Sequence, residues 1–63
     1  MRDINRIYDF CKQLAEYWTK VPDWRFTQLI SNVFGDWQSK NSQDIFFLEE
    51  DEVLEIFEEY FGN

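Results

Sequence analysis

The chain has 63 residues, with six Lys or Arg, thirteen Asp or Glu and no His, so its formal net charge is −7. This length predicts a single domain, 1–63, and an aromatic content of 21% is too high for a disordered chain. A single Cys cannot form an internal disulfide, and without His there is no zinc site of ordinary composition. The small core must therefore be held by aromatic side chains or by a second copy of the chain.

The acidic residues are concentrated in the second half of the chain. Residues 1–31 carry five basic and four acidic side chains, a net charge of +1, whereas residues 32–63 carry one basic side chain against nine acids, a net charge of −8. Binding to DNA or RNA depends mainly on neutralising phosphates, so we expect no direct nucleic-acid contact. The chain has no long apolar stretch and no apolar signal-peptide region, and its lone Cys11 fits a reducing compartment. We expect a cytoplasmic protein that does not enter a membrane.

Residues 3–20 carry the periodicity of an amphipathic helix. Their apolar side chains recur at spacings of three and four and cover an arc of about 120°. They are Ile4, Ile7, Tyr8, Cys11, Leu14, Ala15 and Trp18. Asp3 is suited to the N-cap, and the segment should end before Pro22, because the residue before a proline avoids the helical region. Cys11 lies within the apolar stripe, so we expect it to be a small buried hydrophobe.

A second amphipathic helix is predicted over residues 23–35. Its apolar arc of about 140° contains Phe26, Leu29, Ile30, Val33, Phe34 and Trp37. Asp23 is the candidate N-cap, and Gly35 is the candidate stop, because glycine tolerates the left-handed conformation there. Trp24 points roughly 80° beyond the edge of the arc. It therefore either covers the turn between the helices or lies in water.

Residues 36–48 are expected to form a long loop, followed by a third helix over residues 49–61. The apolar run 45–48 has no second strand to pair with, so we interpret it as an extended segment packed on the core. In the third helix, apolar side chains occupy one face and acidic side chains the opposite face. The acids are Asp51, Glu52, Glu55, Glu58 and Glu59. The sequence therefore predicts a small all-α domain of three helices.

No catalytic, cofactor-binding or metal-binding residues are identified. Without His there is no imidazole base, and two glycines cannot build a phosphate-binding loop. The acidic run 49–52 is typical of a solvated helix start rather than of a metal site. A domain of this size also has little room for a pocket of roughly 300 Å³ or more. We expect a protein that is not an enzyme and has no cofactor.

Three motifs resemble a family of small, uncharacterised bacterial and bacteriophage proteins. The family pattern is Arg-Asp-x-x-Arg-Ile, Pro-Asp-x-Arg-x-x-Gln-Leu-Ile and Asp-x-Phe-Phe/Tyr-x-Glu, and it stands here at residues 2–7, 22–30 and 44–49. Members of the family typically have an Asp-x-Phe-Tyr-x-Glu-Asp run before the last helix, so Phe47 stands where Tyr is common and Glu50 where Asp is common. The resemblance implies a cytoplasmic protein of bacterial or phage origin and brings no established activity.

The second motif places Arg25, Gln28 and Asn32 on one stripe of the second helix. One interpretation is a polar contact surface for a partner. The other, which we favour, is internal: Arg25 pairs with an acid, and the two amide side chains hold the long loop. The acids available to Arg25 are Asp44, Glu50 and Asp51. We also expect Arg2 and Arg6 to pair with acids of the third helix.

The sequence is compatible with three functions. The first, which we favour, is binding to another protein through large aromatic side chains at the edges of the stripes or outside them, because Trp and Tyr are typical interface anchors. These side chains are Phe10, Tyr17, Trp24 and Trp37, and we expect Tyr17, Trp24 and Trp37 to contact the partner. The second is mimicry of a nucleic acid by Glu55, Glu58 and Glu59, which would block a nucleic-acid-binding protein. The third is a homodimer through the first two helices. The sequence does not identify the partner.

Overall fold

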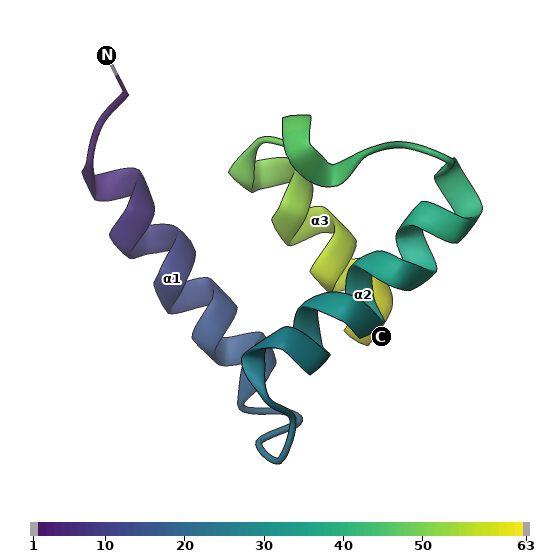
Figure 1. Ribbon diagram of the computed structural model, residues 1–63. Coiled ribbons are helices and arrows are strands. Elements are labelled where there is room, and N and C mark those ends of the chain that lie inside the picture. The colour runs from purple at the N-terminus through teal and green to yellow at the C-terminus, as the bar shows by residue number, and fades with distance from the viewer. Residues whose placement is uncertain (1, 63) are drawn as a thin grey trace.

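The computed structural model describes residues 2–62 and consists of three α-helices and one short 3₁₀-helix (Figure 1). The elements are α1 (Asn5–Trp18), α2 (Phe26–Asn41), η1 (Ile45–Phe47) and α3 (Glu50–Phe61). No strand occurs among residues 2–62, so the predicted all-α fold of three helices is confirmed. α1 and α2 each pack chiefly against α3.

The first and third helices begin close to their predicted starts. A carboxylate oxygen of Asp3 accepts a hydrogen bond from the amide of Asn5 at 2.9 Å, but the N-cap of α1 is Ile4, so the prediction of Asp3 as the N-cap is wrong by one residue. α1 ends at Trp18, two residues before its predicted end. At the start of α3, the amide of Glu49 donates to the side chain of Glu52 at 2.9 Å. This bond satisfies one of the amides that a helix start leaves unpaired.

The second helix begins later than predicted, because the residues before it form a turn. The amide of Trp24 donates to the carbonyl of Val21 at 3.0 Å, which closes the turn between α1 and α2. Asp23 lies in this turn and does not cap the helix, so that prediction is wrong. The N-cap is Arg25, whose amide donates to the side-chain oxygen of Gln28 at 2.7 Å.

The second helix also ends later than predicted. It passes through Gly35 and continues to Asn41, so the predicted loop over 36–48 is wrong for its first six residues. An ion pair between Lys40 and Asp36, at 3.3 Å and one turn apart, supports the added segment. The helix stops at Ser42, which adopts the left-handed conformation with φ 53° and ψ 38°. Trp37, which follows Gly35, packs against the core. This packing outweighs the helix penalty of about 1 kcal/mol that glycine carries.

The apolar run 45–48 is neither a strand nor an extended segment but forms η1 and its C-cap. A carboxylate oxygen of Asp44 accepts from the amide of Phe46 at 3.0 Å, and the amide of Leu48 donates to the carbonyl of Ile45 at 3.1 Å. Side chains three residues apart lie on the same side of a 3₁₀-helix. Ile45 and Leu48 therefore pack together against the core, while Phe46 and Phe47 point into solvent.

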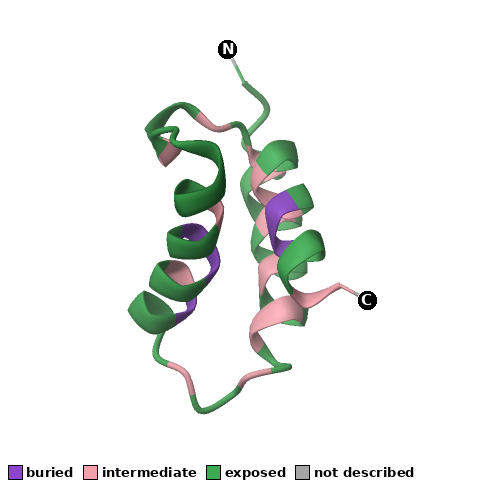
Figure 2. Ribbon diagram, turned by 90° about the vertical axis from the view of Figure 1, so that its right-hand side faces the viewer, coloured by how far each residue is buried: buried purple, intermediate pink, exposed green. Residues whose placement is uncertain are grey.

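The core lies between α2 and α3 (Figure 2). Its buried side chains are Leu29, Val33 and Phe34 of α2 and Ile56 and Phe57 of α3. Phe34 and Phe57 meet edge to face, with ring centroids 5.6 Å apart and an interplanar angle of 83°. This arrangement is one that aromatic rings favour. α1 contributes no buried residue and lies against the core through Leu14, Tyr17 and Trp18, which are half-buried.

One edge of the apolar stripe of α1 is left uncovered. α1 and α2 diverge from the turn that joins them (Figure 1), and α1 lies against α3 through the other edge of its stripe. Cys11 is consequently exposed, so the expectation of a buried thiol is wrong. The sequence defines the width of the stripe but not the angle between α1 and α2.

Two arginines join the N-terminal end of α1 to the start of α3, as predicted. Arg2 lies 2.8 Å from Glu49, and Arg6 pairs with Glu50. The bond with Glu49, followed by the negative charge of that side chain, raises the pKa of Arg2 above its ordinary value. Arg25 makes no ion pair with any acid in the described part of the chain, so its predicted pairing is wrong. Arg25 is the N-cap of α2, and the start of α2 lies at the opposite end of the bundle from the start of α3 (Figure 1).

Candidate protein-binding surface

Tyr17, predicted to contact a partner, lies at the edge of the core. Its ring centroid is 5.6 Å from that of Phe57 and 5.8 Å from that of Phe61. Burial, and then the negative charges of Glu58 and Glu16, raises the pKa of Tyr17. The ring therefore helps α3 to hold α1, and it is only half-exposed.

The two predicted tryptophans are also half-buried. Trp24 covers the turn between α1 and α2, which is the first of its two predicted alternatives. Its carbonyl accepts a hydrogen bond from Nε1 of Trp18 at 2.9 Å, and its ring centroid lies 6.5 Å from that of Phe61. Trp37 packs against the core from the last turns of α2. Contact of these two residues with a partner stays a prediction.

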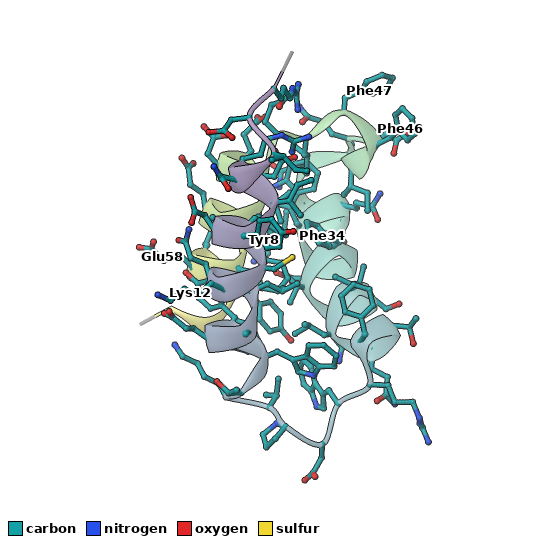
Figure 3. The ribbon with its side chains drawn as sticks, turned by 90° about the vertical axis from the view of Figure 1, so that its left-hand side faces the viewer. Tyr8, Lys12, Phe34, Phe46, Phe47 and Glu58 are labelled. Carbon is teal, nitrogen blue, oxygen red and sulfur yellow. The ribbon has the colours of Figure 1, made fainter. Side chains whose placement is uncertain are left out.

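The three predicted acids lie on the outer face of α3. Glu55, Glu58 and Glu59 are all exposed, and none forms an ion pair within residues 2–62. Figure 3 shows Glu58 on the opposite side of the molecule from Phe46 and Phe47. Glu58 is therefore separate from Phe46 and Phe47, whereas Glu55 and Glu59 line a hollow with Leu48, the C-cap of η1.

An exposed apolar surface, which the sequence did not predict, lies at the open edge of α1 and on η1. We define the α1–η1 surface as Ile4, Ile7, Tyr8, Cys11 and Ala15 together with Phe46 and Phe47. All seven residues are exposed. The ion pairs of Arg2 and Arg6 bring the start of α1 to the junction of η1 and α3, so Ile4 and Ile7 lie at the same end of the bundle as η1, while Cys11 and Ala15 lie further along α1.

The α1–η1 surface is large for a protein of this size. The exposed fractions of its larger residues are 66% for Ile4, 45% for Ile7, 69% for Tyr8, 79% for Phe46 and 78% for Phe47. With full areas of about 180–220 Å² per residue, these five leave roughly 600–700 Å² of surface in water, most of it apolar. The largest apolar patch of a typical monomer covers roughly 300–600 Å² and is often functional.

Local structure holds Phe46 and Phe47 in an outward orientation. The cap by Asp44 and the packing of Ile45 and Leu48 fix η1 on both sides. The two phenylalanine rings meet edge to face, with centroids 5.0 Å apart, and project from the end of the bundle (Figure 3). The sequence signal was present in the spacing of Ile45 and Leu48, which indicates a 3₁₀-turn with the two residues between them turned outward.

The polar stripe of α2, which consists of Arg25, Gln28 and Asn32, is not part of the α1–η1 surface. It borders a shallow hollow of about 300 Å³. The hollow is lined by Trp24, Thr27, Gln28, Ser31 and Asn32. Gln28 bonds to the backbone of Arg25, and the loop it was expected to hold lies at the other end of α2. The internal role predicted for Gln28 is therefore wrong. Contact of this stripe with a partner stays a prediction.

Within residues 2–62, no group of three Cys or acidic side chains could hold a metal ion. Among the described helices, none combines the length and the apolar character that crossing a membrane requires.

The chain matches no protein-family model, no curated protein and no solved structure. Its resemblance to the small bacterial and bacteriophage proteins therefore stays a prediction, carried by the motifs at residues 2–7, 22–30 and 44–49.

Proposed function

We propose that this protein is not an enzyme and acts by binding a protein through the α1–η1 surface. The observation that carries the proposal is the exposure of Phe46 and Phe47, about four-fifths each, beside the uncovered edge of α1. Clustered aromatic side chains that are buried on association supply most of the binding energy in many interfaces. Because η1 is capped and packed, little conformational entropy is lost when these rings bind.

The aromatic residues expected from the sequence have a supporting role in this proposal. Tyr17 and Trp24 hold α1 and the first turn against α3, which keeps the open edge of α1 in place. The exposed, free thiol of Cys11 suits a reducing compartment, so we place the binding event in the cytoplasm.

The acidic outer face of α3 supports a second function. Glu55, Glu58 and Glu59 present unpaired carboxylates on a rigid helix, so they can imitate a row of phosphates. A complex made in this way depends on long-range attraction and weakens as salt rises. A complex anchored by Phe46 and Phe47 depends on apolar burial and is much less sensitive to salt.

An affinity pull-down with matched variants tests the proposal. Tagged protein is exposed to a bacterial lysate that also contains the untagged chain, washed at low salt and then at about 0.5 M salt, where screening is short-ranged. We expect a partner that survives both washes, that Phe46→Ser with Phe47→Ser no longer retains, and that a variant with Glu55, Glu58 and Glu59 changed to Lys still retains. Tyr60→Ser is the control, because Tyr60 is an exposed aromatic outside the α1–η1 surface.

The opposite pattern contradicts the proposal. A nucleic-acid-binding protein that is lost in the high-salt wash and with the three Lys substitutions, but retained by the double Ser variant, would assign function to the acidic face of α3.

A further inference from the structure

The folded monomer has more surface than its mass requires. Its accessible surface is 5043 Å² and its radius of gyration is 12.0 Å. Size scaling gives roughly 4,400 Å² and about 10.6 Å for a folded chain of this size. The excess area of about 600 Å² is close to the apolar area that the α1–η1 surface leaves in water. The helix with the missing contacts is α1, which buries no residue.

This area fits one half of a dimer interface. Stable interfaces between proteins of standard size bury about 800 Å² on each partner. The exposed side chains of Ile4, Ile7, Tyr8, Phe46 and Phe47 supply most of that area. Cys11 and Ala15 have smaller side chains and lie further along α1. They let a second helix approach α1 closely.

The charges are placed so that two copies can meet on this side. None of the residues of the α1–η1 surface is charged, and Glu58 lies on the other side of the molecule from Phe46 and Phe47 (Figure 3). Contact between two copies through the α1–η1 surface therefore places no charge of one surface against a like charge of the other.

The shape of this side is complementary to itself. Phe46 and Phe47 project at the end where α1 begins. At the end where α1 stops there is a hollow of about 240 Å³. Ala15, Trp18, Thr19 and Pro22 line it. A twofold axis that crosses the middle of α1 places Phe46 and Phe47 of each copy at the hollow beside Ala15 of the other copy. A symmetric interface requires such matching.

From these observations, and resting on the protein-binding function proposed above, we infer that the partner is a second copy of this chain. The two α1 helices pair antiparallel through the α1–η1 surface. Cys11 is seven residues from both Ile4 and Trp18, so it lies next to the twofold axis. The two Cys11 thiols of the dimer therefore face each other, and each is accessible in the free monomer.

Sedimentation equilibrium combined with cross-linking tests the inference. We expect the full chain to sediment as a dimer at micromolar concentration, and Phe46→Ser with Phe47→Ser to sediment as a monomer. The double variant should keep its helical circular dichroism, since both side chains are exposed. Tyr60→Ser should remain dimeric. A short bismaleimide should join two chains through Cys11, and Cys11→Ala should abolish the product.

Three results overturn the inference. They are a monomer at the highest concentration reached, a dimer that the double Ser variant leaves intact, and a dimer that the bismaleimide does not join through Cys11. If the chain is monomeric but its lysate partner is lost with Phe46→Ser and Phe47→Ser, the proposed function stands and the inference about the second copy fails.

Discussion

Phe57 is the residue on which the core depends most. It is completely buried, and its ring meets the rings of Tyr17, Phe34 and Phe61. It therefore joins one side chain from each of the three helices. The loss of this ring affects α1 as well as the contact between α2 and α3.

Phe57→Ala should remove a large part of the free energy of unfolding. Truncation of a buried Phe costs about 3–5 kcal/mol, whereas a domain of this size has roughly 3–9 kcal/mol in total. We expect the variant to be largely unfolded or to melt at a much lower temperature in circular dichroism. Phe57→Leu is the milder control. A loss below about 1 kcal/mol would show that Phe57 does not hold the core.

Tyr17 makes the free energy of unfolding depend on pH in the alkaline range. Because its pKa is raised in the folded state, the unfolded chain releases the phenol proton first as pH increases. The contribution of Tyr17 to the free energy of unfolding is fully present at pH values below the ordinary tyrosine pKa of about 10. It is lost as the pH rises through the folded-state pKa. Urea denaturation at pH 8 and near pH 11 should show a smaller alkaline loss in Tyr17→Phe than in the native chain. Equal losses would contradict this role.

The helices show which parts of the fold the sequence could predict. Their number and faces follow from apolar spacing, because this spacing decides which side of a helix can be buried. The end of α2 could not be predicted from Gly35, since the packing of the following turn decides whether a helix continues. The exposure of Cys11 and Tyr8 depends on how α1 leans against α3, which no local pattern specifies. The candidate surface was missed for the same reason.

Gly35 offers a stabilising substitution within α2. A Cβ atom added at Gly35 meets nothing within 4 Å, and the residue has a helical conformation. Gly35→Ala should raise the free energy of unfolding by about 1 kcal/mol and the melting temperature by about 4–8 °C. Gly62→Ala is the contrasting variant, because its added Cβ would collide with the carbonyl oxygen of Glu58. A melting temperature unchanged by Gly35→Ala would contradict the helical assignment.

At the scale of the whole molecule, the chain has an acidic side and an apolar side. α3 presents its acids outward, while α1 and η1 expose Tyr8, Phe46 and Phe47. Two functions can follow from this arrangement, and they respond to salt in opposite directions.

Self-association should become tighter as salt increases. Each copy carries a net charge of −7, so two copies repel each other, and salt screens that repulsion. We expect the dimer dissociation constant to fall by about threefold or more between roughly 0.02 and 0.3 M salt, over which the Debye length shrinks several-fold. Sedimentation at both salt concentrations measures the change. A dimer that dissociates as salt rises would indicate an interface made by charged side chains.

The most direct measurement is an isotope-filtered nuclear Overhauser experiment on a mixture of labelled and unlabelled chains. It detects only contacts between two different copies. The account predicts cross-peaks from the ring protons of Phe46 and Phe47 in one copy to the methyl group of Ala15 in the other. A spectrum without contacts between copies, or with contacts confined to the acidic face of α3, would contradict it.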